Sequence, residues 1–268
     1  MTKQKIRLLI TLMGMAVLGL VGFQWHWITS ALALRNEQFN LKVSDAMQDV
    51  VRKLEKQEII YLIRHGETDY NRRGVVQGSG IDAELNELGH AQAQAFYEAY
   101  QHLVFDKIYT SKLIRTHQSV RGFLEKGYPH EAYEGLNEIS WGVREGRTPN
   151  SMDNDYYRWL VESWQSGQVD LEAEGGESPV DVQKRQLPVI DLILSRPEEK
   201  MVLVAMHGRA MRVLLATIFN RPLHEMDEYL HTNLGLYLLH YDYVTQTFSI
   251  EKQNDIAHLE LLPPVNIL

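Results

Sequence analysis

Two histidines of this 268-residue chain each follow a short run of apolar, β-prone residues and each precede a glycine. His65 comes shortly after the run 59–63, and His207 comes directly after the run 201–206. Continuous apolar runs of this length are typical of strands buried on both faces of a parallel sheet. Ligands bind at the carboxyl end of such strands, where helix N-termini favour anions. The two imidazoles are therefore predicted to share one anion-binding edge of a sheet.

The composition excludes several other chemistries. The chain contains no cysteine, which excludes disulfides, thiolate zinc sites, iron–sulfur clusters and a cysteine nucleophile. His224-Glu225 lacks the second histidine of a zinc-binding helix motif, and no glycine-rich run matches a nucleotide-binding loop. We therefore expect no metal and no cofactor. The histidines without a preceding strand are interpreted as surface or core residues, and they are His26, His90, His102, His117, His130, His224, His231, His240 and His258.

Further segments extend the pattern around these two histidines in chain order. They are Arg64 to Thr68 with Asn71, Gln77-Gly78, Ser111 to Ser119 with Arg115, Leu136-Asn137-Glu138 with Gly142 and Glu145-Gly146, Gly175 to Ser178, and His207-Gly208. From about residue 58 to the end, this order resembles the histidine phosphatase superfamily, in the branch that contains the cofactor-dependent phosphoglycerate mutases. The resemblance rests on several separated motifs rather than on one.

The resemblance implies a phosphohistidine mechanism with His65 as the nucleophile. Glu138 would protonate the leaving oxygen and later, as a base, activate water. The phosphoryl oxygens would be bound by Arg64, Arg115 and His207, since planar guanidinium groups match such oxygens and stay charged. The expected substrate contacts are Asn71, Gln77, Gly78 and Gly208. Glu67 and Thr68 are interpreted as residues that shape the loop.

Three functions are open for such a site. The first is a metal-independent phosphomonoesterase for small phosphorylated metabolites, the second a phosphoglycerate mutase, and the third a noncatalytic, membrane-tethered phosphate-binding module. We favour hydrolysis, because mutases of this family usually have a longer catalytic part and because Glu145-Gly146 after Trp141-Gly142 resembles the phosphatases. The expected partner is a small phosphomonoester, and the net charge of −8 argues against nucleic acid.

Alternating strands and helices must position these residues. The strands are predicted at 59–64, 107–110, 201–206, 235–242 and 246–251, and the helices at 87–101, 113–126, 151–166, 179–194 and 208–219. This alternation is typical of a three-layer α/β/α sandwich with a mostly parallel central sheet. The aromatic-rich helix at 151–166 has two interpretations, a helix packed on the core or a lid over the substrate.

The first 57 residues differ from the rest in charge and pattern. Their eight basic and four acidic residues give a net charge of +4. Because the whole chain carries −8, the remaining residues carry a net charge of −12. Residues 8–34 contain no Asp, Glu, Lys or Arg and include Trp25 and Trp27, as is typical of a transmembrane helix. A cleaved signal peptide is the alternative.

The predicted organisation is thus a membrane segment over 1–34, an amphipathic helical linker over 35–57 and a catalytic domain over 58–268. The first two parts resemble the membrane segment of bacterial sensor kinases in pattern. Cations before the span favour a single-pass membrane protein with the catalytic domain outside the cytoplasm. The alternative location is the cytoplasm.

Overall fold

A computed structural model describes the chain in two compact units, Met1–Glu55 and Lys56–Leu268. The described residues are 19–30, 32–36, 38–40, 42–44, 47, 57–147, 150–260 and 262. In the first unit, those described are helical, and large apolar side chains such as Trp25 and Trp27 are exposed.

The transmembrane helix predicted over 8–34 is not found in the part of the chain that is described. Among those residues, no helix combines the length and the apolar character needed to cross a bilayer. Residues 8–18 lie outside the described residues, and the predicted linker over 35–57 is described only in part.

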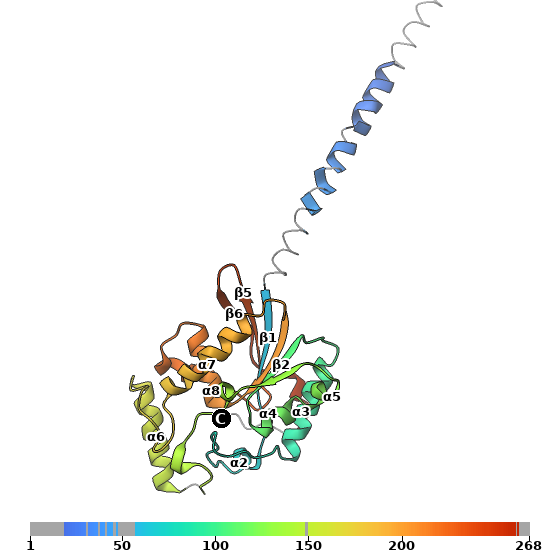
Figure 1. The fold of residues 1–268 in the computed structure, drawn as a ribbon. Helices are drawn as coiled ribbons and strands as arrows, with labels where there is room; N and C mark the ends of the chain where they lie inside the picture. Colours follow the sequence, from blue (N-terminus) through green and yellow to red (C-terminus); the bar gives the residue numbers. More distant parts are fainter. Residues whose placement is uncertain are drawn as a thin grey trace, which may run out of the picture. The chain divides into compact units, whose positions relative to one another are not determined.

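The second unit is built around a six-stranded sheet with the order β3-β2-β4-β1-β5-β6 (Figure 1). Its strands are β1 (Gln57–Arg64), β2 (Lys107–Thr110), β3 (His130–Ala132), β4 (Met201–Met206), β5 (Leu236–Asp242) and β6 (Thr247–Asp255). Strands β3, β2, β4 and β1 are parallel, whereas β5 is antiparallel to β1 and β6 is antiparallel to β5. The sheet is therefore mixed, and the short strand β3 was not predicted.

Helices connect the strands and cover both faces of the sheet. They are α2 (Asp69–Arg72), α3 (Glu87–Tyr100), α4 (Ile114–Ser119), α5 (Arg121–Glu125), α6 (Ser151–Gln165), α7 (Pro179–Leu194) and α8 (Gly208–Ile218). Short 3₁₀ helices are η1 (Glu134–Leu136), η2 (Gly142–Arg144), η3 (Leu223–Glu228) and η4 (Ala257–Leu259). The helix predicted over 113–126 is two helices, because Val120 lies between them with φ −112° and ψ 13°.

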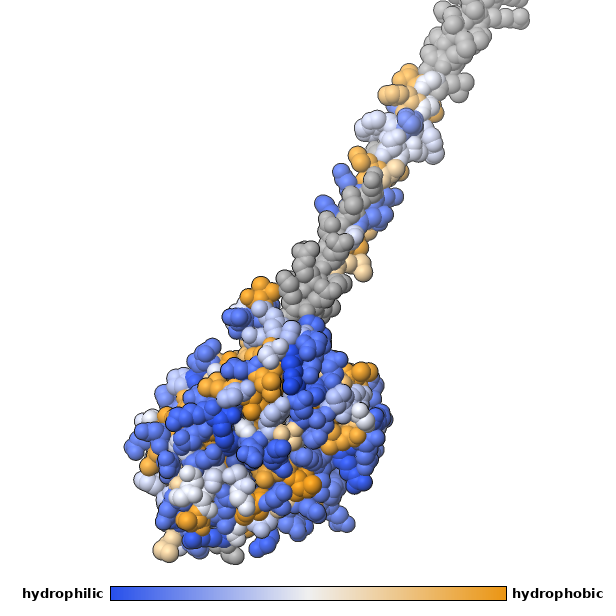
Figure 2. All heavy atoms as spheres, in the orientation of Figure 1, coloured by the Kyte–Doolittle hydropathy of each residue, from blue (hydrophilic) through white to orange (hydrophobic). Residues whose placement is uncertain are grey.

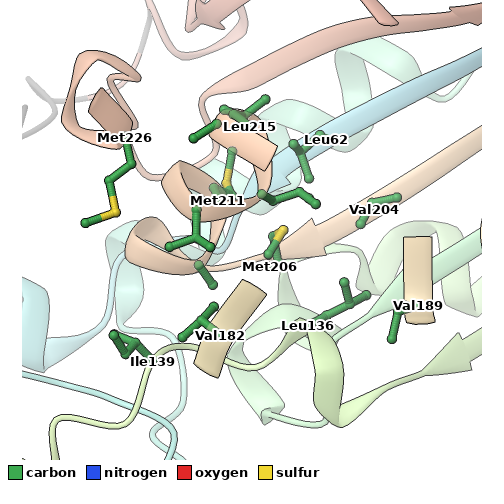
Figure 3. Packing of buried hydrophobic residues seen from close by; sticks show 14 of the residues in the cluster. Leu62, Leu136, Ile139, Val182, Val189, Val204, Met206, Met211, Leu215 and Met226 are labelled. Carbon is green, nitrogen blue, oxygen red and sulfur yellow. The ribbon is translucent and has the colours of Figure 1, made fainter. Parts of the chain in front are cut away.

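Two hydrophobic clusters lie on opposite faces of the sheet. Successive side chains of a strand alternate between faces, so Leu62 belongs to one cluster and Ile63 to the other. The Leu62 cluster includes Val182 of α7 and Leu215 of α8 (Figure 3), and the Ile63 cluster includes Phe96 of α3. Hydrophilic residues cover most of the face in Figure 2. These layers confirm the predicted α/β/α arrangement.

The sheet brings the ends of β1 and β4 together. The two strands pair in parallel with Arg64 opposite Met206, and the backbone N–H of His65 donates to the carbonyl of Met206 at 3.0 Å. The loop after β1 also packs closely on α3, because a Cβ atom on Gly66 would lie 2.7 Å from the carbonyl oxygen of Gly89. His65 and His207 therefore leave the sheet side by side.

Candidate active site

The two predicted histidines form a buried pair. The ring centroids of His65 and His207 are 5.1 Å apart, and both residues are almost completely buried. A pair of imidazoles at one sheet edge is what the two apolar runs predicted.

His65 is held in the tautomer that a nucleophile requires. Its Nδ1–H donates to the carbonyl oxygen of Gly66 at 2.7 Å, since a carbonyl can only accept. Nε2 then keeps its lone pair. Burial, together with the charges of Arg115 and Arg64, holds the pKa of His65 well below its ordinary value. The ring is therefore neutral near pH 7, with Nε2 ready to attack.

Arg115 and His207 are fixed by one hydrogen-bonded chain. Arg115 Nε donates to His207 Nδ1 at 3.2 Å, so His207 Nε2 carries the proton and donates to Ser111 Oγ at 2.8 Å. Arg115 also donates to the carbonyl oxygens of Ile81 at 2.7 Å and Gly78 at 3.2 Å. Burial lowers the pKa of Arg115 to about 10, which leaves it charged near pH 7. Its guanidinium is a fixed positive charge beside the histidines.

The side chain of Glu138 lies at the N-terminus of α8, the helix that begins directly after His207. Its Oε1 accepts the backbone N–H groups of Ile139 and Ala210, both at 2.9 Å, and its Oε2 accepts that of Arg209 at 3.2 Å. A carboxylate is favourable at a helix N-terminus, where unpaired N–H groups and the helix dipole meet. The backbone N–H groups of Arg209 and Ala210 at this helix N-terminus are thus occupied by the acid.

A residue that sequence reasoning missed holds the backbone around Glu138. Arg185 of α7 donates to the carbonyl oxygens of Gly135 and Asn137, both at 2.9 Å, and of Glu138 at 3.0 Å. It also pairs with Glu177 at 2.8 Å. Five donors in a rigid plane allow one arginine to bind several carbonyls of one turn. Arg185 therefore positions the catalytic acid Glu138, although its own side chain does not line the cavity next to Glu138.

That cavity has a volume of about 370 Å³. Of the predicted residues, its wall contains Arg64, Asn71, Gln77, Glu138 and Gly208. His65, Arg115, His207 and Gly78 are not among the lining residues; Gly78 packs against the Glu145 carboxylate, which would lie 2.2 Å from an added Cβ atom. The wall also contains residues that sequence reasoning did not select, namely His231, Arg209, Arg212, Arg144, Arg147, Tyr156 and Tyr157. The assignment of His231 to the core or surface was incomplete, because it lines the site.

Two buried N–H donors in the wall have no partner in the described part of the chain, Arg64 Nε and Gln77 Nε2. The amide of Gln77 is oriented by Thr68, whose hydroxyl donates to Gln77 Oε1 at 2.9 Å. Arg64 Nη1 lies 3.2 Å from His231 Nδ1, and burial lowers the pKa of Arg64 to about 10. Buried donors are almost always paired in proteins, so an anion bound here would satisfy both.

The predicted loop-shaping residues do shape the loop. Thr68 caps α2, where its side chain accepts the N–H of Asn71. The Glu67 carboxylate accepts a hydrogen bond from the Asn86 side chain at 2.8 Å. Asn71 is reached in turn by the amide of Asn233, 3.3 Å away. These contacts fix the direction in which the chain leaves β1.

Helix α6 packs on the hydrophobic core and also forms part of the cavity wall. Its Trp164 is completely buried, and its Tyr157 packs against Trp141 with ring centroids 5.1 Å apart. The core-packing interpretation of this helix is confirmed, while Tyr156 and Tyr157 also face the cavity. In the described part of the chain, no three His, Asp or Glu side chains are grouped so that they could hold a metal ion.

Comparison with known proteins gives four findings. The family model of the histidine phosphatase superfamily (branch 1) matches residues 60–256. The "Probable phosphoglycerate mutase GpmB" of Yersinia pestis is 28% identical over 206 residues, which cover 75% of this chain and 95% of that protein. The structure of YhfR from Bacillus stearothermophilus is 26% identical, with a TM-score of 0.66 over 76% of this chain and 100% of its own. A mycobacterial glucosyl-3-phosphoglycerate phosphatase in complex with inorganic phosphate is 25% identical, with a TM-score of 0.64 over 75% of this chain and 99% of its own.

Proposed function

Because the chain belongs to the histidine phosphatase superfamily (branch 1), we propose that it hydrolyses small phosphomonoesters through a phosphohistidine formed on His65. The observation that carries this proposal is the neutral His65 ring, whose Nδ1–H is bonded to Gly66 so that Nε2 keeps its lone pair. The complex of a similar phosphatase with inorganic phosphate supports the same substrate chemistry.

In the first step, Nε2 of His65 attacks phosphorus and the bond to the leaving oxygen breaks. Arg64 and Arg115 balance the charge of the phosphoryl oxygens, as fixed cations do in phosphoryl transfer, while His207 holds Arg115 in place through its Nδ1. Glu138 gives its proton to the leaving oxygen, so that an alcohol departs. Such a proton transfer contributes ~10²–10⁴-fold to the rate.

In the second step, water attacks the phosphohistidine. The Glu138 carboxylate takes a proton from the water, the bond between phosphorus and Nε2 breaks, and inorganic phosphate leaves. His65 returns to its neutral form and Glu138 to its protonated form. The cycle therefore needs no group besides this chain, the ester and water.

The test is release of inorganic phosphate from a panel of phosphomonoesters with a chelator present. We expect activity for the wild type, loss of at least ~10³-fold in His65→Ala, and an unchanged rate in the matched control His224→Ala, whose side chain is 46% exposed. Activity that requires added metal, or that survives in His65→Ala, would contradict the proposal.

A mutase is the second candidate, favoured by the name of the 28% identical Yersinia protein. It would use the same phosphohistidine but return the phosphoryl group to another hydroxyl of the same molecule. Incubation with 3-phosphoglycerate distinguishes the two. Hydrolysis gives glycerate and phosphate, whereas a mutase gives 2-phosphoglycerate faster than it releases phosphate.

For the N-terminal unit, the proposal is a single membrane span over residues 8–34 with the catalytic unit outside the cytoplasm. Its support is the absence of Asp, Glu, Lys and Arg from that run and the three cations before it. Carbonate extraction of membranes from cells that express the tagged full chain is the test. We expect the chain in the extracted membrane and accessible to external protease; a shortened or an extractable chain would instead indicate cleavage or a cytoplasmic protein.

A further inference from the structure

The two arginines beside the nucleophile are held by very different numbers of contacts. Arg115 donates to Nδ1 of His207 and to two backbone carbonyl oxygens. Arg64 is almost completely buried, yet within the described residues its side chain donates to a single acceptor, Nδ1 of His231 at 3.2 Å. The orientation of the Arg64 guanidinium therefore depends on His231.

His231 can accept from Arg64 only in one protonation state. A guanidinium has donors and no acceptor, so Nδ1 of His231 must carry the lone pair and Nε2 the proton. Burial, followed by the charge of Arg64, holds the pKa of His231 well below its ordinary value. The ring is therefore neutral near pH 7, and Nδ1 is available as an acceptor.

The segment that carries His231 is itself fixed to the end of β1. The backbone N–H of Leu234 donates to the carbonyl of Arg64 at 3.0 Å, and the amide of Asn233 donates to the carbonyl of His65 at 2.9 Å. The backbone of Arg64 and the ring that holds its side chain are thus placed by one short stretch of chain before β5.

The first residue of α8 leaves room for this ring. A Cβ atom on Gly208 would lie 2.6 Å from Cε1 of His231 and 3.0 Å from each of its ring nitrogens. These distances are too short for a side chain, and glycine is the residue that permits so close an approach. Gly208 therefore lets the His231 ring lie against the start of α8.

We propose that His231 is a positioning residue for phosphoryl transfer, which holds Arg64 so that Nε of this arginine points to the phosphoryl group. This inference rests on the proposed phosphatase activity. Arg64 Nε is buried without a partner within the described residues, and fixed donors of this kind stabilise a transition state without reorganisation. Without His231, Nη1 would be a second unpaired buried donor. Because such donors are costly, the guanidinium would turn toward another acceptor.

Substitutions of His231 separate its acceptor from its bulk. The readout is kcat/KM for 4-nitrophenyl phosphate, whose leaving group needs no proton from Glu138. His231→Leu keeps an apolar side chain of similar size but no acceptor, so kcat/KM should fall by ~10–100-fold, the value of a hydrogen bond to a charged group. His231→Asn keeps an oxygen at the position of Nδ1 and should stay within ~3-fold of the wild type. The matched control is His224→Leu, since that side chain is 46% exposed, and its kcat/KM should equal that of the wild type.

A double-mutant cycle shows whether His231 acts through Arg64. Arg64→Met removes the guanidinium, so adding His231→Leu to it should lower kcat/KM by no more than ~2-fold. A packing role would predict the same 10–100-fold fall, on the order of one charged hydrogen bond, in both backgrounds. That result would contradict the proposal.

A spectroscopic measurement keeps the test valid where His231→Leu does not fold. In the ¹⁵N-histidine-labelled wild type at pH 7, His231 should have its proton on Nε2, the opposite tautomer to His65. Its signals are assigned by their loss in His231→Asn. A proton on Nδ1, or an imidazolium, would contradict the proposal, because neither form accepts from Arg64.

The failures of the two proposals look different. If the wild type releases phosphate from no ester, the proposed function itself is wrong. If the wild type is active and His231→Leu equals it, or if His231→Asn lowers kcat/KM as much as His231→Leu, the enzyme is a phosphatase in which His231 does not position Arg64.

Discussion

The His65 ring stays neutral because its surroundings oppose a second proton. Burial is the largest cause, and Arg115 and Arg64 add repulsion, so the pKa lies well below the ordinary value. An unperturbed histidine is about three-quarters protonated at pH 6. We predict that ¹⁵N-labelled His65 keeps the chemical shifts of a neutral ring, with the proton on Nδ1, from pH 8 to pH 6. Shifts of an imidazolium at pH 6 would contradict this account.

At Glu138 the prediction concerns the leaving group. Glu138→Gln removes the proton that the departing oxygen needs, so hydrolysis of an alkyl phosphate should slow by ~10²–10⁴-fold. Formation of the phosphoenzyme from 4-nitrophenyl phosphate should be nearly unaffected, because nitrophenolate leaves without a proton. Rapid-mixing measurements of nitrophenolate release check this directly. An equal slowing of both esters would show that Glu138 acts other than by proton transfer.

The sequence motifs correctly identified those active-site residues that belong to short motifs in a fixed order along the chain. His65, His207, Arg115 and Glu138 do lie together, each fixed by contacts near the ends of β1 and β4. His231 was missed because it follows no strand in the sequence and reaches Arg64 only through the fold. Arg209 and Arg212 had a usable signal, since two cations three residues apart share one face of a helix that starts at the second histidine.

At the level of elements, α7 positions the acid through Arg185. Arg185→Gln removes bonds to the carbonyls of Gly135, Asn137 and Glu138. We predict a fall in kcat of ~10-fold or more, since misplacement of a catalytic group is costly, with KM for the ester little changed. Lys184→Gln is the control, because that side chain is 71% exposed. If only the melting temperature changed, Arg185 would have a purely structural role.

Most strands and long helices could be predicted from their sequences, including the four-residue strand β2, but strand β3 could not. Strand β4 and helices α6 and α7 carry enough periodic residues to define their type and, within a residue or two, their ends. Strand β3 has three residues without an alternating pattern, and β2 alone pairs with it. Its existence depends on a neighbour distant in the chain, which local patterns do not report.

For the whole molecule, the sheet end opposite the site contains a titrating group. Glu58 is fully buried and accepts from the Tyr243 hydroxyl at 2.5 Å. Burial raises the pKa of Glu58 from 4.5 to about 7, so the folded chain holds a proton that the unfolded chain releases. The contribution of this proton to the free energy of unfolding is fully present below pH 4.5. It is lost as the pH rises through 7, a change of about 3 kcal/mol.

Glu58→Gln removes that titration and keeps an acceptor for Tyr243. Urea unfolding of both proteins between pH 4.5 and pH 8 provides the measurement. The free energy of unfolding of the wild type should fall by about 3 kcal/mol relative to the variant over this range. Parallel curves would contradict this account, because they would mean that folding does not raise the pKa of Glu58.

Net charge is a poor guide to the ligand of this molecule. The whole chain carries −8, yet five arginines line one cavity. An excess of negative surface charge repels large polyanions at a distance, while the local cations bind a small anion that has reached the cavity. The global balance therefore favours small phosphomonoesters over nucleic acids, in agreement with the site.

Direct detection of the phosphohistidine is the measurement that tests the central claim. Glu138→Gln mixed with 4-nitrophenyl phosphate should accumulate the phosphoenzyme, because water is no longer activated for the second step. After an alkaline quench, mass spectrometry should find one acid-labile phosphoryl group on the peptide that contains His65, and none in the protein that also carries His65→Ala. A phosphoryl group on another residue, or rapid turnover with no phosphorylated peptide, would contradict the account.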